Sequence, residues 1–490
     1  MNLKILYITL GILSTELLAA QNQTMEMSLE QVVKIARLES PDAQTARHSF
    51  RSAYWNYQYY RANYLPSLSL SSDPNLNRAI NKITMGDGSV KFVEQNLLNT
   101  DLTLNLSQNI PWTGGSLFLE TSAQRMDLFS EHKYSWQTSP IMIGYRQSLF
   151  GYNSLKWDKR IEPVRYQEAK KNYVETLELV SANAINKFFA LATAQSNYDI
   201  ASFNYANADT LYRYAQGRYN IGTITENEML QLELNRLTEE TNRMNARIEM
   251  DNCMQELRSY LGIQEEREIR VRVSSRIPNF SINLNEALAL AYENSPDIQT
   301  MKRRKLESES AVARARANAG LKADIYLRFG LTQTADKLPE AYRNLLDQQY
   351  VSLSISLPIL DWGRGKGQVR VARSNRDLVY TQVEQSRTDF ELNVRKLVKQ
   401  FNLQTQRVRI AARTDETAQR RNEVARKLYI LGKSTILDLN ASISEKDSAR
   451  RNYVSALYNY WSLYYTLRSM TLYDFESNKL LTEDYNLLIE

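Results

Sequence analysis

One stretch of the sequence has residue types that bind nucleotides, the tetrapeptide Gly432-Lys433-Ser434-Thr435. A Walker A loop ends in these residues, because its backbone N–H groups cradle phosphates while the lysine and the hydroxyl reach the terminal phosphates and Mg²⁺. Such a loop also needs a preceding strand and a glycine five residues before its Gly-Lys pair. That position is Lys427, inside a helical pattern, so we reject a phosphate site.

Few other residues could bind a metal or act as nucleophiles. His48 and His132 are the only histidines, and neither has a cysteine or carboxylate at the spacing of a zinc site. Cys253 is the only cysteine, which excludes an internal disulfide framework and fits a small packed residue on a helix. The glycines of DWGRGKGQ follow a strand pattern but match no nucleotide motif. We therefore expect no enzyme, no metal and no cofactor.

The elements that carry these residues are long. The 490 residues include only 16 glycines and 10 prolines, so few positions interrupt a helix or a strand. Basic and acidic residues alternate along the helical segments and leave a net charge of +6, which is typical of solvated helix faces. No basic stripe stands out, so we expect no nucleic-acid partner.

The N-terminus is typical of a secretory signal peptide. Lys4 precedes an apolar run that is too short to span a bilayer, and the small residues Ala19 and Ala20 follow it. We assign residues 1–20 to a cleaved signal peptide, which predicts export of the remaining chain.

The exported sequence contains an internal repeat. Leu29–Thr45 aligns without a gap with Leu284–Thr300, and both contain Ser-Pro-Asp, in which the serine caps a helix and the proline takes its first position. We predict a first repeat over 21–262, a linker over 263–282, a second repeat over 283–475 and a tail over 476–490. Helices are expected over 28–64, 153–262, 283–321 and 362–475, with strands over 65–152 and 322–361.

The long helices carry a coiled-coil pattern. Between Leu191 and Tyr219, large and small side chains alternate at spacings of three and four residues, mostly as tyrosine and alanine. A repeat of 3.5 residues suits packing against a second helix. In each half, two shorter helical segments add up to about the length of the long one, which favours antiparallel helical rods.

The strand segments have one apolar face. In the predicted strands of 322–361 every second residue is apolar, as in Ile325, Leu327 and Phe329. Tryptophan and tyrosine at the ends of such strands form membrane-interface belts. The aromatic residues assigned to this belt are Trp55, Trp157 and Trp362. Alternation bounded by aromatic residues is typical of an outer-membrane β-barrel in contact with lipid.

The number of strands decides the assembly. The first half has additional strand candidates around a tight turn at Pro111–Gly115, and the sequence leaves open whether one chain supplies four or six strands. The smallest membrane barrels have about eight strands, and an unpaired backbone group in lipid costs several kcal/mol. One chain therefore cannot close a barrel, and several copies must share one.

Together these features resemble the outer-membrane efflux proteins of the TolC type. The resemblance covers nearly the whole mature chain and rests on the duplicated Ser-Pro-Asp helix starts, the strand ends QSLF and SLPILDWG, and the helix turns YNIG and YILGKSTILDLNAS. It implies a mainly α fold with membrane β-structure: a homotrimer with a shared outer-membrane barrel of roughly twelve strands and a coiled-coil α-helical barrel in the periplasm.

The resemblance also implies a function. The chain would be the passive exit duct of a tripartite efflux or type I secretion system. Its partners would be a periplasmic adaptor (membrane fusion protein) and an inner-membrane pump of the RND, ABC or MFS class. The exported substrate and the class of pump stay open.

Residues at the helical turns are assigned by the same resemblance. In this family an acidic ring and a hydrogen-bonded lock close the periplasmic tip. The matching gate residues are Asp438, Glu228, Tyr429 and Ser434. The turn residues expected to contact the adaptor are Gly222, Thr223, Gly432 and Lys433. Ser434 stands where the family pattern has an arginine, and Ala441 where it has a second acid, so the sequence leaves undecided whether an ionic lock closes the tip. In the alternative reading, Asp438 and Glu228 only stabilise the starts of their helices.

Two other functions compete with the export duct. A secreted periplasmic coiled-coil scaffold explains the helices but not the alternating strands bounded by aromatic residues. A nucleotide-hydrolysing enzyme rests only on residues 432–435, and would require ATP binding that Lys433→Ala abolishes.

Overall fold

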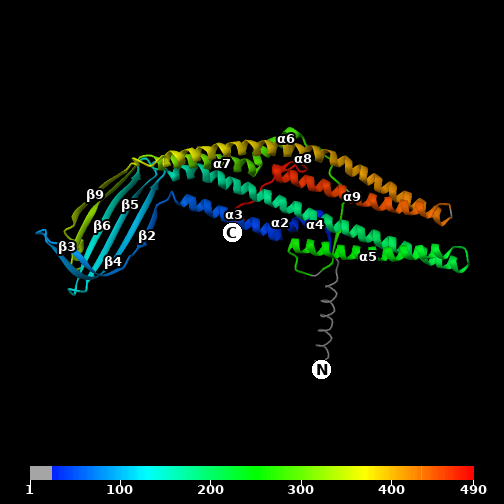
Figure 1. The fold of residues 1–490 in the computed structure, drawn as a ribbon, viewed down its shortest axis with the longest axis horizontal. Coiled ribbons are helices and arrows are strands. Elements are labelled where there is room, and N and C mark those ends of the chain that lie inside the picture. Colours follow the sequence, from blue (N-terminus) through cyan, green and yellow to red (C-terminus); the bar gives the residue numbers. More distant parts are fainter. Residues whose placement is uncertain (1–24, 266, 275, 432, 490) are drawn as a thin grey trace, which may run out of the picture. The chain divides into compact units, whose positions relative to one another are not determined.

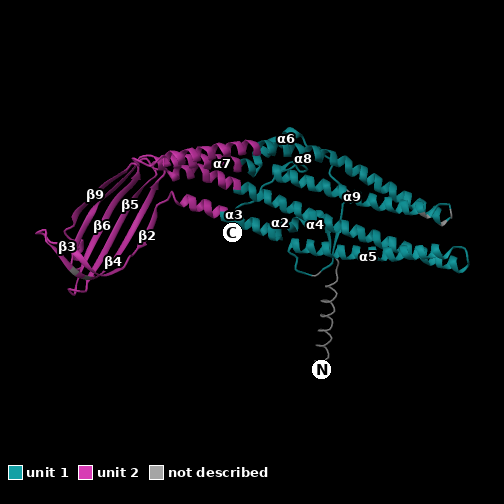
Figure 2. Cartoon of the chain, in the orientation of Figure 1, with its two compact units in different colours: residues 1–52, 169–298, 387–490 teal, residues 53–168, 299–386 magenta. Residues whose placement is uncertain are grey.

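The computed structural model describes residues 25–489 apart from 266, 275 and 432, and Figure 1 shows its fold. The expected signal peptide at 1–20 and the turn residue Gly432 lie outside the described residues. The chain divides into two compact units, each assembled from separate stretches (Figure 2). Unit 1 comprises the described parts of 1–52, 169–298 and 387–490, and unit 2 comprises 53–168 and 299–386.

The helices repeat in length as well as in sequence. Three matched pairs have 11, 67 and 36 residues: α2 (Leu29–Glu39) and α6 (Leu284–Asn294), α4 (Ser154–Asn220) and α8 (Arg364–Ile430), and α5 (Glu226–Leu261) and α9 (Ile436–Thr471). The fourth pair, α3 (Pro41–Ala62) and α7 (Pro296–Ala319), has 22 and 24 residues. Within the described residues, no helix is both long and apolar enough to cross a bilayer.

The duplicated Ser-Pro-Asp motif starts a helix in each half. The Ala43 backbone N–H donates to Ser40 Oγ at 3.1 Å, and the Asp297 N–H donates to Ser295 Oγ at 3.2 Å. Both serines are fully buried, and each satisfies an N–H group that has no partner within its own helix.

The tyrosine–alanine repeat of α4 joins that helix to α5 inside unit 1. Its alanines are buried at positions 194, 201, 208 and 215. The rings of Tyr198, Tyr205 and Tyr212 lie under arginine side chains of α5, with guanidinium-to-centroid distances of 5.6, 4.2 and 5.6 Å to Arg247, Arg243 and Arg236. The small residues allow close packing, while the tyrosines add cation–π contacts.

Unit 2 contains an antiparallel sheet in the order β2-β4-β5-β6-β8-β9, with β3 also paired to β4. The strands are β2 (Ser67–Ser71), β3 (Asn75–Thr84), β4 (Val90–Ile110), β5 (Gly115–Leu128), β6 (Lys133–Ser148), β8 (Lys322–Ala335) and β9 (Leu346–Ser356). β2 pairs with residues 103–107 of β4 and β3 with residues 90–99, so both occupy one edge. The sheet thus contains seven strands, which occupy six positions across its width.

Two small sheets lie outside this arrangement. β1 (Met25–Ser28) pairs in parallel with β7 (Ile269–Arg272), which falls in the segment predicted to be a linker. β10 (Tyr473–Asp474), at the end of the predicted second repeat, pairs with β11 (Lys479–Leu480) in the predicted tail. The sequence pattern did not indicate either pair.

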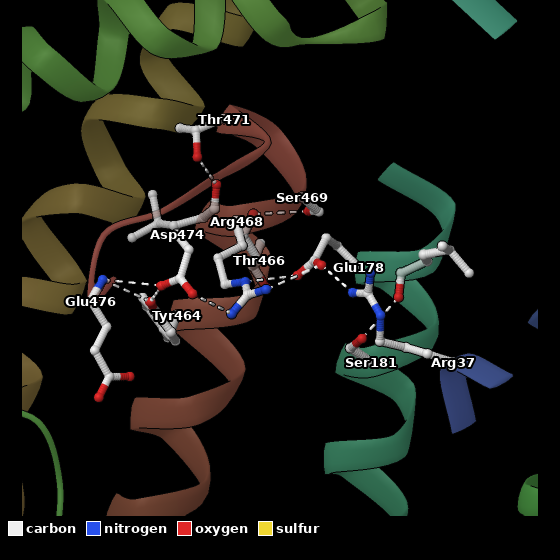
Figure 3. A network of polar contacts seen from close by, with 12 residues as sticks. Arg37, Glu178, Ser181, Tyr464, Thr466, Arg468, Ser469, Thr471, Asp474 and Glu476 are labelled. Atoms are coloured by element: carbon white, nitrogen blue, oxygen red, sulfur yellow. Dashed lines mark hydrogen bonds and ion pairs between the residues drawn. The ribbon is translucent and has the colours of Figure 1, made fainter. Parts of the chain in front are cut away.

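A buried ion-pair network joins distant parts of unit 1 (Figure 3). Glu178 of α4 is fully buried and accepts hydrogen bonds from Arg37 of α2 and Arg468 of α9. Arg37 also pairs with Glu483 at 2.7 Å, and Arg468 with Asp474 at 3.4 Å. Each buried charge therefore has an opposite charge beside it, which a low-dielectric interior requires.

Candidate functional site

One face of the sheet is continuously apolar. Hydrogen-bond register aligns a row across five neighbouring strands: Leu68, Leu106, Leu119, Ile143 and Phe329. Each of these side chains is at least 38% exposed in the single chain. A second row carries the same face to β9 through Leu117, Tyr145, Leu327 and Val351. An exposed apolar surface of this extent calls for an apolar partner.

The opposite face is polar and aromatic. The hydroxyls of Ser67 and Ser107 lie 2.8 Å apart, and Glu120 pairs with Arg328 at 3.1 Å. On β6, a side chain at Gly144 would collide with the Phe118 ring, because a Cβ there would lie 2.0 Å from its nearest carbon. The two faces therefore differ in chemistry from β2 to β9, as in barrels with lipid outside and water inside, whereas β3 carries an exposed ion pair between Arg78 and Glu94 of β4.

Exposed aromatic and aliphatic side chains mark the strand ends that adjoin the helices. Trp362 is 90% exposed and Trp112, in the turn between β4 and β5, is 86% exposed. Trp55 on α3 is also exposed, whereas Trp157 is half-buried with Arg160 over its ring at 4.7 Å. Sequence reasoning assigned three of these residues to an interface but treated Trp112 only as part of a turn.

The glycine-rich run after β9 starts helix α8. The Asp361 carboxylate accepts hydrogen bonds from the N–H groups of Gly363 at 2.9 Å and Gly365 at 2.8 Å. Gly363 has φ +86°, and a Cβ at Gly365 would lie 3.0 Å from Ala319 Cβ. The backbone N–H groups of these glycines therefore bind the Asp361 carboxylate at the start of a helix and do not form a phosphate-binding loop.

Charged and aromatic residues gather at the other end of the apolar face. Arg125 of β5 forms an ion pair with Asp127 at 2.6 Å, and its guanidinium lies 5.0 Å from the Tyr134 ring centroid and 5.7 Å from that of Trp136. Aromatic residues thus bound the apolar face at both ends, as they do at membrane–water interfaces.

The turn between α4 and α5 is closed by a glycine and a capping box. Gly222 has φ +73° and its N–H donates to the Tyr219 carbonyl at 2.8 Å. Thr223 Oγ1 donates to the Arg218 carbonyl at 2.9 Å. In α5, Glu228 N–H donates to Thr225 Oγ1 and the Glu228 carboxylate accepts from Thr225 N–H.

The turn between α8 and α9 repeats this arrangement. Asp438 and Thr435 form the capping box, and the Thr435 hydroxyl donates to the Asp438 carboxylate at 2.7 Å. Ser434 Oγ adds a bond at 3.4 Å, and Lys433 N–H donates to the Leu428 carbonyl. Hydrogen bonds from Thr435 lower the pKa of Asp438 below its usual range, so the carboxylate is ionised at neutral pH. Tyr429, half-buried, lies in the last turn of α8.

The predicted gate residues thus have local roles in one chain. Glu228 and Asp438 occupy equivalent positions in the two repeats, each three residues after the capping threonine. Their carboxylates stabilise their own helix starts. Sequence spacing found both acids but not this shared capping arrangement, although Thr-x-x-Glu and Thr-x-x-Asp are readable signals for it.

Comparison with known proteins gives a family match over part of the chain. The match to the family described as Outer membrane efflux protein covers residues 287–471. This match, together with the fold similarities below, confirms the TolC-type resemblance inferred from the sequence and favours a channel over a periplasmic scaffold.

Solved channel structures share the fold over nearly the whole chain. The Campylobacter jejuni CmeC outer membrane channel is similar with a TM-score of 0.67 and 16% identity, over 94% of this chain and 88% of that one. The Vibrio cholerae outer membrane protein VceC gives 0.63 and 14%, over 90% and 95%. The Neisseria gonorrhoeae MtrE channel gives 0.60 and 14%, over 93% and 90%. No curated protein sequence matches this chain.

The described part of the chain contains no cluster of histidine, cysteine, aspartate and glutamate side chains that could hold a metal ion. Lys433 and Ser434 lie in a helix–helix turn, between α8 and α9, rather than after a strand.

Proposed function

We propose that this protein is the outer-membrane exit duct of a tripartite efflux or type I secretion system, through which cargo passes without chemical change. The continuous apolar face of the sheet carries this proposal. It needs lipid on one side, while its polar opposite face suits an aqueous pore. The family match and the channel fold support the same function.

The open edges of the sheet support a homotrimer. β2 and β9 are the end strands in the pairing order of the described sheet, so the backbone N–H and C=O groups on one side of each pair with no other strand of that sheet. Those groups are costly in lipid and favour pairing with further copies. We take the number of copies, three, from the channels of this fold.

The helical turns are proposed as the periplasmic end of the duct. Gly222, Thr223 and Lys433 would contact a periplasmic adaptor, which links the duct to an inner-membrane pump. Glu228 and Asp438 from each copy would converge with Tyr429 and Ser434 around the constriction, where carboxylates favour cations over anions.

Paired substitutions in β9 test the membrane assignment. Leu353 lies on the apolar face and its neighbour Ser354 on the polar face. An arginine near the bilayer midplane on the lipid face costs about 2–4 kcal/mol, whereas one facing water costs little. Leu353→Arg should therefore deplete the protein from outer-membrane fractions and abolish pores in planar bilayers, while Ser354→Arg should retain both.

The alternative outcome is equally clear. Equal tolerance of both substitutions, in a chain that purifies without detergent, would favour the periplasmic scaffold. ATP binding abolished by Lys433→Ala would instead favour the nucleotide enzyme.

A further inference from the structure

The sheet is wider than a four-strand contribution to the barrel. Its hydrogen-bonded path has six positions, of which β2, β4, β5 and β6 come from the first repeat and β8 and β9 from the second. The two repeats therefore contribute unequally. A barrel of roughly twelve strands, as the resemblance implies, would use only four strands per copy and would leave two outside the wall.

The extra strands have the chemistry of a barrel wall. Leu68 and Leu70 of β2 pair with Leu106 and Leu104 of β4 on the apolar face, and all four leucines are exposed. The Ser67–Ser107 hydroxyl pair lies on the opposite face. A hairpin outside the barrel wall would not need an apolar face and a polar face aligned in register with those of β5 and β6.

Strand direction also permits the wider closure. β2 follows α3 and runs away from the helices, whereas β9 runs back towards α8. Adjacent strands of the sheet are antiparallel throughout, so an even number of strands keeps this alternation when one copy joins the next. β9 also presents Val351 and Leu353 on the same face as the β2 leucines.

We infer that three copies close an eighteen-stranded barrel in which the β2 and β3 edge of each copy pairs with β9 of the next. The inference rests on the proposed function, because it needs a trimer in a membrane. At a strand spacing of ~4.8 Å and a tilt of ~40°, the barrel radius rises from ~12 Å for twelve strands to ~18 Å for eighteen. The outer-membrane exit therefore admits bulkier cargo than a twelve-stranded one.

Disulfide trapping between copies tests this seam. In a Cys253→Ser background, Ser69→Cys in β2 is combined in turn with Ser352→Cys, Ser354→Cys and Ser356→Cys in β9. The comparison series replaces Ser69→Cys with Ser116→Cys in β5, which would be the edge strand if β2 and β4 lay outside the wall. A disulfide needs Cβ atoms about 3.5–4.5 Å apart, so only the true edge can react across copies.

The eighteen-stranded barrel predicts covalent dimers and trimers on non-reducing gels for at least one β2–β9 pair and for none of the β5–β9 pairs. Cross-linking by the β5–β9 pairs alone would overturn it in favour of twelve strands. A membrane trimer that neither series cross-links would also overturn it. A water-soluble monomer would instead contradict the proposed function itself.

Electron cryo-microscopy of the unmodified trimer gives a second measurement that needs no variant. Eighteen strands in the barrel wall would support the inference, and twelve would refute it.

Discussion

Removing the Glu178 carboxylate should destabilise unit 1 more than removing any surface acid. Glu178 is 0% exposed and lies between two arginines, with Arg468 Nε at 2.8 Å from one of its oxygens and Arg37 hydrogen-bonded to the other (Figure 3). The side chains of Arg37 and Arg468 are 22% and 13% exposed, so water would solvate their charges poorly if the carboxylate were removed. Removing one partner of a buried ion pair costs about 3–5 kcal/mol.

The remaining contacts set the magnitude for each substitution. In Glu178→Ala, Arg37 keeps Glu483 and Arg468 keeps Asp474, so we expect ~3 kcal/mol, the lower end of that range. In Glu178→Gln one hydrogen-bond acceptor remains, and we expect ~2 kcal/mol. The measurement is the denaturant midpoint of the detergent-purified protein, followed by circular dichroism of the helices.

A matched control separates burial from charge. Glu256 of α5 pairs with Lys187 at 2.9 Å, but its side chain is 58% exposed. Glu256→Gln should cost under ~1 kcal/mol, because solvent screens such pairs. If the unfolding midpoint of Glu178→Ala equalled that of this control within experimental error, the assignment of a stabilising role to the network would be wrong.

Three further predictions follow from the helices. Burial, and then the charge of Asp297, raise the pKa of Glu175 from 4.5 to about 7, so its contribution to stability is complete below pH 4.5 and is lost as pH rises through 7. Glu175→Gln should remove this pH dependence, worth at most ~3 kcal/mol, from unfolding midpoints measured between pH 4 and 8. Asp438→Ala should raise conductance in planar bilayers or weaken block by multivalent cations, and unchanged block would remove Asp438 from the constriction. Tyr205→Leu should lose about 0.5–2 kcal/mol by removing the cation–π contact with Arg243, and a double-mutant cycle with Arg243→Gln that gives no coupling would refute this.

Local signals predicted most of the helical structure. The serine caps, the tyrosine–alanine spacing and the turn at Gly222 each act through residues a few positions apart, so the sequence displays them directly. The alternation in β8 and β9 likewise indicated an apolar face before any pairing was known.

Features that depend on contacts between residues far apart in the sequence were harder to predict from it. Whether the additional strands of the first repeat joined the sheet depends on hydrogen bonds between residues of β2 and β4 that are 32 to 40 positions apart. Alternation alone does not set that register. The arginines that pair with Glu178 lie 141 and 290 residues away from it. The parallel pairing of β1 with β7 joins two segments that carry no strong strand pattern.

The central claim is that one face of the sheet contacts lipid and the other contacts water. Nitroxide labels on single cysteines in β9, at positions 351 to 356 in a Cys253→Ser background, measure this directly in reconstituted membranes. Labels at Val351, Leu353 and Ile355 should be accessible to oxygen, and labels at Ser352, Ser354 and Ser356 to a water-soluble nickel chelate. Equal access of the nickel chelate to all six positions would contradict the account.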